Sequence, residues 1–261
     1  SSSLVGSEMC IRDSIQQIPE HELARLREKA KEITGSQSDY HSSYTELLTR
    51  RLNGEPLQYI EEYIPFYSIQ INVDQRCLIP RPETEFLIEL IKNKSDNPKK
   101  ILDVGTGTGC IALMLKKLYP ESTVDACDIS LESLDLAKEN SEINNLEINL
   151  FQSDLLSDVE EVDYDVIVAN LPYIPTNTLS SLESEVVDYE PLVALDGGVD
   201  GLLYINRLIK EIEEKDITNL TLFLEVDTSH ATTILNNLSH WKQVELEKDL
   251  VERDRYIIAK R

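Results

Sequence analysis

The sequence predicts an α/β protein built on a seven-stranded, doubly wound, mostly parallel sheet. Short apolar runs alternate with helical patterns from about residue 100 to the C-terminus, as in βαβ folds. The run Ile101–Val104 breaks into Gly105, Gly107 and Gly109 and resumes directly as a helix, which is the strand, turn and helix of nucleotide-binding sheets. The length of 261 residues leaves room for a small additional unit before the sheet.

The first 62 residues are predicted to be mainly helical. Ile18–Ile33 and Tyr44–Leu52 carry apolar residues at helical spacing, and Asn53-Gly54 ends the second helix. Residues 1–14 are Ser-rich and lack periodicity, so we expect this stretch to be non-native or disordered. The helical unit is therefore expected to comprise residues 15–62.

A β-hairpin is predicted to connect this unit to the sheet. Residues 54–60 are expected to form a turn that leads to an extended segment, and the alternation in Phe66–Asn72 and Arg76–Ile79 predicts two strands within residues 63–80. The sheet domain, residues 81–261, then begins with a helix that starts at Pro82 or Thr84 and ends at Ile91. The remaining pattern predicts helices over residues 131–140, 202–213 and 228–238, and strands over residues 101–104, 123–127, 147–151, 164–169, 221–226, 242–247 and 255–260.

The segment before the first of these helices is stiff and charged. Pro80 and Pro82 fix the backbone around Arg81, and Glu83 follows directly. Arg81 and Glu83 are therefore candidates for the wall of a pocket. A stiff linker with a capped helix would explain the same residues.

The glycine-rich turn is the first candidate binding element. Its residues Gly105, Thr106, Gly107, Thr108 and Gly109 would present backbone N–H groups and the positive end of a helix to a ligand. Asp103 lies in an apolar strand end, where an unpaired carboxylate is costly, and Asp128 ends the next strand, where ribose hydroxyls could donate to it. NAD-binding proteins share this layout, whereas an acid before the first glycine resembles the S-adenosylmethionine loop of methyltransferases. The turn alone leaves both open.

The second candidate element is the turn Asn170-Leu171-Pro172-Tyr173, which follows a strand predicted to be buried on both faces. The carboxyl ends of parallel strands meet at one edge, so this turn and the glycine turn should line the same site. Prolines fix the directions of its carbonyl groups, and Asn170 adds a side-chain acceptor. Such a turn suits a planar –NH2 group, whose hydrogens it can accept while Tyr173 packs on the plane.

Composition excludes several other classes of protein. The net charge is −23, and between Glu121 and Asp200 twenty acidic residues accompany a single basic one, Lys138. This surface would repel DNA or RNA and favours a protein or small-molecule substrate. The four cysteines and four histidines are scattered, so we expect no metal site and a reducing, cytoplasmic compartment. No apolar stretch is long enough for a membrane span.

Seven segments together resemble the release-factor glutamine N5-methyltransferases, a family of class I S-adenosylmethionine-dependent methyltransferases with a Rossmann-like sheet. The segments are Gly54–Ile60, Leu78–Glu85, Asp103–Leu113, Asp128–Ser130, Ser153–Leu155, Asn170–Pro175 and Glu190–Leu202. They occur in the family's order from about Leu52 onward. Arg81-Pro-Glu-Thr-Glu85 and Gly197-Gly-Val-Asp-Gly201 are the more specific of them.

The resemblance implies a cofactor, a substrate and their sites. S-adenosyl-L-methionine would lie over Gly105–Gly109, with Asp128 on the ribose and Leu155 beside the adenine. Asn170–Tyr173 would hold the glutamine of the Gly-Gly-Gln motif of class 1 peptide chain release factors, which residues 15–62 would help to recognise. The expected cofactor-binding residues are Asp103, Gly105, Thr106, Gly107, Thr108, Gly109, Asp128, Leu155 and Asn170, and the expected catalytic or substrate-binding residues are Asn170, Leu171, Pro172, Tyr173, Arg81 and Glu83. We expect a monomer.

Three other functions are compatible with parts of the sequence. An adenine-N6 nucleic-acid methyltransferase uses the same kind of amine-holding turn, but the acidic surface opposes it. A glutamine methyltransferase of a ribosomal protein is a second alternative. A non-catalytic S-adenosylmethionine-binding module is a third, since Leu171 and a shortened helical unit depart from the family pattern.

Leu171 stands where the family usually has proline. The backbone carbonyl that would accept from the substrate survives this change, but some stiffness of the turn is lost. We expect Leu171→Pro to raise kcat for methyl transfer by a few-fold, measured at saturating substrates. An unchanged kcat would contradict the stiffness argument.

Overall fold

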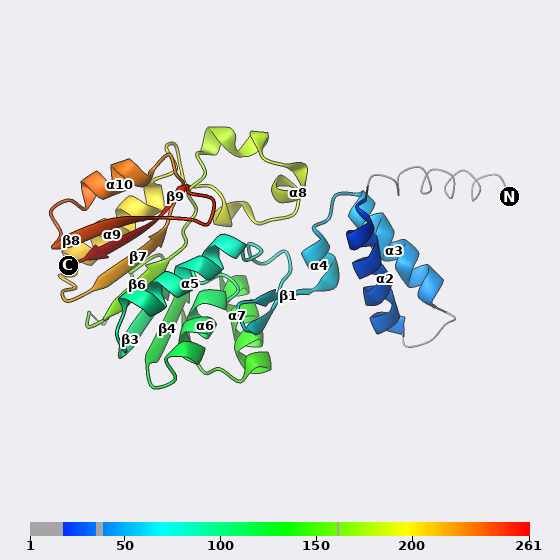
Figure 1. Ribbon diagram of the computed structural model, residues 1–261, viewed down its shortest axis with the longest axis horizontal. Coiled ribbons are helices and arrows are strands. Elements are labelled where there is room, and N and C mark those ends of the chain that lie inside the picture. Colours follow the sequence, from blue (N-terminus) through cyan, green and yellow to red (C-terminus); the bar gives the residue numbers. More distant parts are fainter. Residues whose placement is uncertain (1–17, 35–38, 161) are drawn as a thin grey trace.

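The computed structural model describes residues 18–34, 39–160 and 162–261 (Figure 1). Its centre is a seven-stranded sheet whose strands are β3 (Lys100–Val104), β4 (Thr123–Asp128), β5 (Asn149–Gln152), β6 (Val166–Ala169), β7 (Thr221–Glu225), β8 (Gln243–Lys248) and β9 (Asp254–Lys260). The spatial order is β5-β4-β3-β6-β7-β9-β8. The first five strands in this order are parallel, and β9 is antiparallel to both β7 and β8. The predicted fold class is confirmed.

Helices cover both faces of the sheet (Figure 1). They are α5 (Pro82–Lys94), α6 (Cys110–Leu118) and α7 (Leu131–Asn144) on one face, and α9 (Leu203–Glu214) and α10 (Ala231–Asn237) on the other. Successive residues of a strand point to opposite faces, so Ile101 packs in the cluster with α5 and α6, and Leu102 in the cluster with α9 and α10. The two cores meet only through the sheet, which keeps the strand ends in fixed positions.

The N-terminal helices form a unit with a small core of its own. They are α2 (Glu20–Thr34), α3 (Tyr40–Leu52) and the one-turn α4 (Leu57–Glu61). Leu26, Leu47 and Ile60 are buried in this core. The α2–α3 pair stands at one end of the molecule, away from the sheet (Figure 1). The first 14 residues, predicted to be non-native or disordered, lie outside the described residues.

The helical unit is tied to the loop that follows β6. Arg51 pairs with Glu22 of α2 at 2.6 Å and reaches Glu185 of the loop at 3.2 Å. The Tyr189 hydroxyl donates to the Asn53 carbonyl oxygen at 3.0 Å. The two contacts with the loop connect residues that are 134 and 136 positions apart in the sequence.

The structure corrects three local predictions. Residues 57–61, most of which were predicted to belong to a turn, form a short helix, because Tyr59 and Ile60 donate back to the Pro56 carbonyl and bury their side chains. The hairpin pairs β1 (Tyr63–Phe66) with β2 (Ile69–Asn72), and no strand covers residues 76–79. The N–H of Arg76 donates to Asp74 Oδ1, which closes a local turn in place of a strand.

The second helix also begins earlier than predicted. It starts at Tyr40 instead of Tyr44, and the rings of these two tyrosines stack with centroids 6.0 Å apart. Residues four apart lie on the same face of a helix, so this pair favours the additional turn.

Candidate active site

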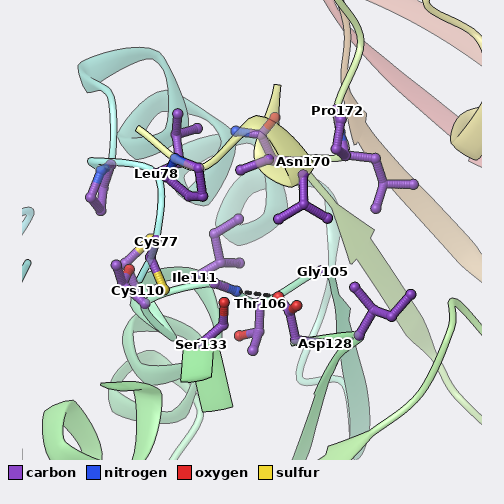
Figure 2. A pocket seen from close by; sticks show the side chains of 18 of the residues that line it. Cys77, Leu78, Gly105, Thr106, Cys110, Ile111, Asp128, Ser133, Asn170 and Pro172 are labelled. Atoms are coloured by element: carbon purple, nitrogen blue, oxygen red, sulfur yellow. Dashed lines mark hydrogen bonds between the residues drawn. The ribbon is translucent and has the colours of Figure 1, made fainter. Parts of the chain in front are cut away.

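A pocket opens at the carboxyl ends of β3, β4 and β6. Asn170 and Pro172 lie on one side of it, across from Gly105 and Asp128 (Figure 2). The residues predicted from sequence that line it are Arg81, Gly105, Thr106, Gly107, Thr108, Asp128, Leu155, Asn170, Leu171 and Pro172. The structure thus brings the two candidate turns together at one pocket.

Four predicted site residues do not line this pocket. Asp103 and Gly109 lie beneath the glycine turn and are fully or almost fully buried. Glu83 points toward the β8–β9 hairpin, where Arg253 approaches its carboxylate at 3.4 Å. Tyr173 packs against the core, and Arg255 Nη1 donates to its hydroxyl at 3.4 Å. Their expected contacts with ligands remain predictions.

The glycine turn has the backbone conformation that its sequence requires. Gly105, Gly107 and Gly109 have φ values of +73°, +54° and +79°, which side chains other than glycine rarely adopt. A Cβ on Gly109 would lie 3.1 Å from Ala137 Cβ, whereas a Cβ on Gly107 would meet no atom within 4 Å. Gly109 therefore allows close packing on α7, and Gly107 leaves open space above the turn.

Asp103 holds the glycine turn from below. Its Oδ2 accepts from the Thr106 hydroxyl at 2.6 Å and from the Ala112 N–H at 3.2 Å. Its Oδ1 is buried without a hydrogen-bond partner. Burial raises the pKa of Asp103 to about 7, against the two hydrogen bonds, which lower it. The side chain thus joins β3 to the first turn of α6.

Asp128 joins the second strand to the same turn. Its Oδ2 accepts from the Gly107 N–H at 2.9 Å and its Oδ1 from the Ser130 N–H at 3.0 Å. Each carboxylate oxygen has a further lone pair, and the residue lines the pocket. Asp128 can therefore accept a hydrogen bond from a ligand while it holds the turn.

The turn after β6 is held by close packing on its neighbours. Leu171 is buried, and a Cβ on Gly105 would lie 2.9 Å from Leu171 Cδ2, so its side chain covers the glycine turn. A Cβ on Gly197 would lie 2.8 Å from both the Pro172 carbonyl oxygen and Tyr173 Cα. The Gly197–Gly201 segment therefore forms the back of the turn and needs its small residues for that close approach.

The loop between this turn and α9 closes one side of the pocket. It contains the short helices η2 (Thr176–Ser181), α8 (Ser184–Val187) and η3 (Leu192–Ala194). Its end returns to its start, because Ile174 exchanges backbone hydrogen bonds with Leu195 and Gly197 at 3.1 and 2.8 Å. Val193 and Ala194 from this loop line the pocket.

An ion pair fastens the loop to the start of α5. Arg81 Nη2 lies 2.6 Å from Glu190 Oε1, and the side chain of Glu190 is only 2% exposed. Burial raises the pKa of Glu190 even though Arg81 lowers it, and its Oε2 has no partner. Arg81 and Glu190 belong to Leu78–Glu85 and Glu190–Leu202, two of the segments that resemble one family. The ion pair brings these two segments into direct contact.

We expect Arg81→Ala to lower the free energy of unfolding by about 1–3 kcal/mol, because it leaves the buried Glu190 carboxylate unpaired. The lower end of this range allows for the partial exposure of Arg81, which weakens the ion pair. Loss of Arg81 lets the Glu190 pKa rise further, so this deficit should grow as pH rises from 5 to 8 and the carboxyl ionises. Urea unfolding at both pH values measures it. Arg81→Ala with Glu190→Gln should be more stable than Arg81→Ala alone at pH 8. If the changes in the free energy of unfolding caused by Arg81→Ala and Glu190→Gln simply add in the double variant, this interpretation is contradicted.

Sequence reasoning missed two buried residues behind Asn170. Asn170 Nδ2 donates to Thr84 Oγ1 at 3.2 Å, and Thr84 Oγ1 donates to Glu225 Oε2 at 2.9 Å. Glu225 ends β7 and is 2% exposed. An acid at the tip of an apolar strand is the signal that identified Asp128, and it applies equally to Glu225. Thr84 carried no signal of its own.

Among the described residues, no group of three or more His, Cys, Asp and Glu side chains could hold a metal ion. Cys77, Cys110 and Cys127 are buried as free thiols. No helix in the described part of the chain is long and apolar enough to cross a membrane.

Comparison with known proteins agrees with this geometry. The family model of the methyltransferase small domain matches residues 82–186. Among solved structures, the ribosomal protein L11 methylase from Lactobacillus delbrueckii subsp. bulgaricus superposes with a TM-score of 0.51 at 23% identity, over 69% of this chain and 78% of that one. A methyltransferase from Pyrococcus furiosus has a TM-score of 0.54 at 21% identity, over 74% and 88% of the two chains. At these identities the likeness shows the fold.

Curated relatives are closer in sequence. The release factor glutamine methyltransferase of Thermodesulfovibrio yellowstonii is 37% identical over 88% of this chain and 84% of its own length. That of Lactococcus lactis subsp. lactis is 36% identical over 83% of this chain and 81% of its own length. A match of this extent includes both candidate turns and the segments behind them. The chain is an enzyme and belongs to the family of release factor glutamine methyltransferases.

Proposed function

We propose that the enzyme transfers a methyl group from S-adenosyl-L-methionine to N5 of the glutamine in the Gly-Gly-Gln motif of class 1 peptide chain release factors. The observation that carries this proposal is the pocket in which Asn170 lies across from Gly105 and Asp128. The names of the relatives support the release factor glutamine as the substrate. The pocket adds a place for the cofactor and for a planar amide.

The residues present fit S-adenosyl-L-methionine. Asp128 would accept from the ribose hydroxyls, Leu155 would contact the adenine, and the open space above Gly107 admits a ligand close to the backbone. The methionine part would then lie toward Asn170, on the far side of the glycine turn. When bound, this group supplies a methyl carbon that is electrophilic because it is attached to a positively charged sulfur.

The chain's own contribution is placement of the substrate nitrogen. An amide nitrogen is a poor nucleophile because its lone pair is delocalised into the carbonyl group. Asn170 Oδ1 and the Leu171 carbonyl oxygen would accept its two hydrogens, which favours a more pyramidal nitrogen and aims its lone pair at the methyl group. Placement and preorganised dipoles of this kind supply up to ~7–11 kcal/mol in well-aligned cases. No base is needed before attack, since the proton can leave afterwards.

The acidic surface supports a protein substrate over a nucleic acid. The chain carries a net charge of −23, so it would repel a phosphate backbone and attract a basic region of a protein partner. An adenine-N6 methyltransferase would need the opposite charge. The amide-holding turn therefore serves a glutamine side chain.

Mass spectrometry of a release factor incubated with the enzyme and S-adenosyl-L-methionine tests the proposal. We expect one added methyl group on the glutamine of Gly-Gly-Gln. The matched controls are a release factor that carries Gly-Gly-Glu, which should give no product, and the Asn170→Ala enzyme, which should give it about 10²–10³-fold more slowly. Methylation elsewhere, or none with the cofactor bound, would refute the proposed substrate.

A further inference from the structure

The side-chain amide of Asn170 can turn in two ways, and only one of them suits the substrate. With Oδ1 toward the pocket the amide accepts a hydrogen from an –NH2 group. With Nδ2 toward the pocket two donors would face each other. The orientation of this amide therefore decides whether the turn attracts or repels the substrate nitrogen, and something in the protein must fix it.

The contact behind Asn170 is a chain of two hydrogen bonds. Thr84 Oγ1 lies 2.9 Å from Glu225 Oε2, and Asn170 Nδ2 lies 3.2 Å from Thr84 Oγ1. Thr84 is 3% exposed and Glu225 is 2% exposed, so water does not compete for these groups. The three residues come from α5, the end of β6 and the end of β7.

The direction of this chain follows from counting hydrogens. An ionised carboxylate only accepts, so the single hydroxyl hydrogen of Thr84 goes to Glu225. The Thr84 oxygen can then only accept from Asn170, and the –NH2 group of Asn170 must face Thr84. The Asn170 oxygen is left for the pocket, which this residue lines.

We propose that Thr84 and Glu225 are positioning residues, which orient the Asn170 amide so that its oxygen faces the substrate nitrogen. The proposal rests on the function proposed above and adds the residues that make the turn selective for a hydrogen-bond donor. Thr84 also lines the pocket, whereas Glu225 lies behind it. Glu225 acts on Asn170 through Thr84 and also directly, because a hydrogen bond from the Asn170 side chain lowers the pKa of Glu225.

The arrangement reverses when Glu225 takes up a proton. A neutral carboxyl group can donate to Thr84, which can then donate to Asn170 Oδ1 and release the –NH2 group toward the pocket. Burial raises the pKa of Glu225 to about 7, so this change falls within the working range of pH. The titratable and charged groups around Glu225 are Glu83 of α5, Tyr173, Arg255 and Tyr256. Of these, Arg255 lowers its pKa and Glu83 raises it.

The first test compares Thr84→Val with Thr84→Ser. Valine has the shape of threonine without the hydroxyl, and serine keeps the hydroxyl. We expect kcat for release-factor methylation to fall about tenfold in Thr84→Val, with KM within about twofold, and to stay within about threefold of the parent in Thr84→Ser. Equal kcat in Thr84→Val and parent, or an equal loss in Thr84→Ser, would overturn the proposal. Thermal unfolding of both variants identifies a loss caused by misfolding.

The second test is the pH profile. At saturating cofactor, kcat of the parent should decline as pH falls through about 7, and Glu225→Gln should abolish this decline because it cannot ionise. Asp103 titrates in the same range but lies beneath the cofactor turn, so its effect should appear in the KM for the cofactor. An unchanged acid limb in Glu225→Gln would overturn the proposal.

The third test needs no catalysis and separates this inference from the proposed function. The ¹H–¹⁵N signals of the Asn170 side chain, identified by their absence in Asn170→Ala, should shift with a midpoint near pH 7 in the parent and stay constant in Glu225→Gln. If the parent methylates no release factor, the proposed function fails, and this titration still decides the role of Glu225. A signal that does not respond to pH would refute it.

Discussion

Replacement of Asn170 by alanine is expected to lower kcat for methyl transfer by about 10²–10³-fold, the range seen when one preorganised group that stabilises a transition state is removed. Asn170 lines the pocket, and in the proposed mechanism its oxygen is one of two acceptors for the substrate nitrogen, which alanine removes. Single-turnover kinetics at saturating cofactor measures the chemical step directly.

The matched control for this prediction is Asn177→Ala. Asn177 is an exposed asparagine in η2 of the same loop, and we expect its replacement to change kcat by less than about twofold. The affinity of Asn170→Ala for the cofactor should stay within about threefold of the parent, because the glycine turn and Asp128 are unchanged. A comparable kcat for Asn170→Ala and the parent would show that another group holds the substrate nitrogen.

Gly201→Ala is expected to destabilise the protein by about 3–5 kcal/mol and to lower kcat at least about tenfold. Gly201 has a φ of +74°, and a Cβ there would overlap the Tyr173 carbonyl oxygen and lie 2.5 Å from His230 Cε1. One of these obstacles is backbone, so the turn that carries Asn170 has to move. Chemical denaturation and steady-state kinetics measure the two effects.

Gly54→Ala provides the control for backbone strain alone. Gly54 has a φ of +90°, but the nearest atom to a Cβ there is Tyr189 Cε2 at 3.9 Å. We expect this variant to lose about 1–2 kcal/mol, the cost of a left-handed conformation for alanine, with kcat unchanged. If the two glycine variants lose the same stability, packing against Tyr173 is not the reason for a glycine at position 201.

The residues that sequence predicted well share a local signal. A glycine turn after an apolar strand, an acid at the tip of the next strand and an asparagine at the tip of a third are all visible within a few residues. Parallel strands end at one edge, so knowledge of the fold class was enough to bring Gly105, Asp128 and Asn170 together. The hairpin register and the α4 turn depended on side-chain burial, and there the prediction was wrong.

The residues that sequence reasoning missed depend on contacts between distant segments. Thr84 and Glu225 are 141 positions apart, and Arg81 and Glu190 are 109 apart. Neither pair follows from spacing or composition. The first needs the start of α5 to meet the end of β7, and the second needs it to meet the loop after β6. For the same reason Glu83 and Tyr173, which are next to pocket residues in sequence, are turned toward Arg253 and Arg255.

The contacts of Arg51 and Tyr189 with the loop after β6 affect how a large substrate can bind. They join the helical pair to the loop whose later residues Pro191, Val193 and Ala194 line the pocket. A protein substrate that contacts both the helical pair and this loop would restrict little additional motion between them on binding. Contact energy gained far from the reacting amide is therefore available to hold that amide in place. The enzyme can then distinguish one protein substrate from others through contacts at the helices, which are tens of residues from the site residues in the sequence. The methyl-transfer site itself does not have to change.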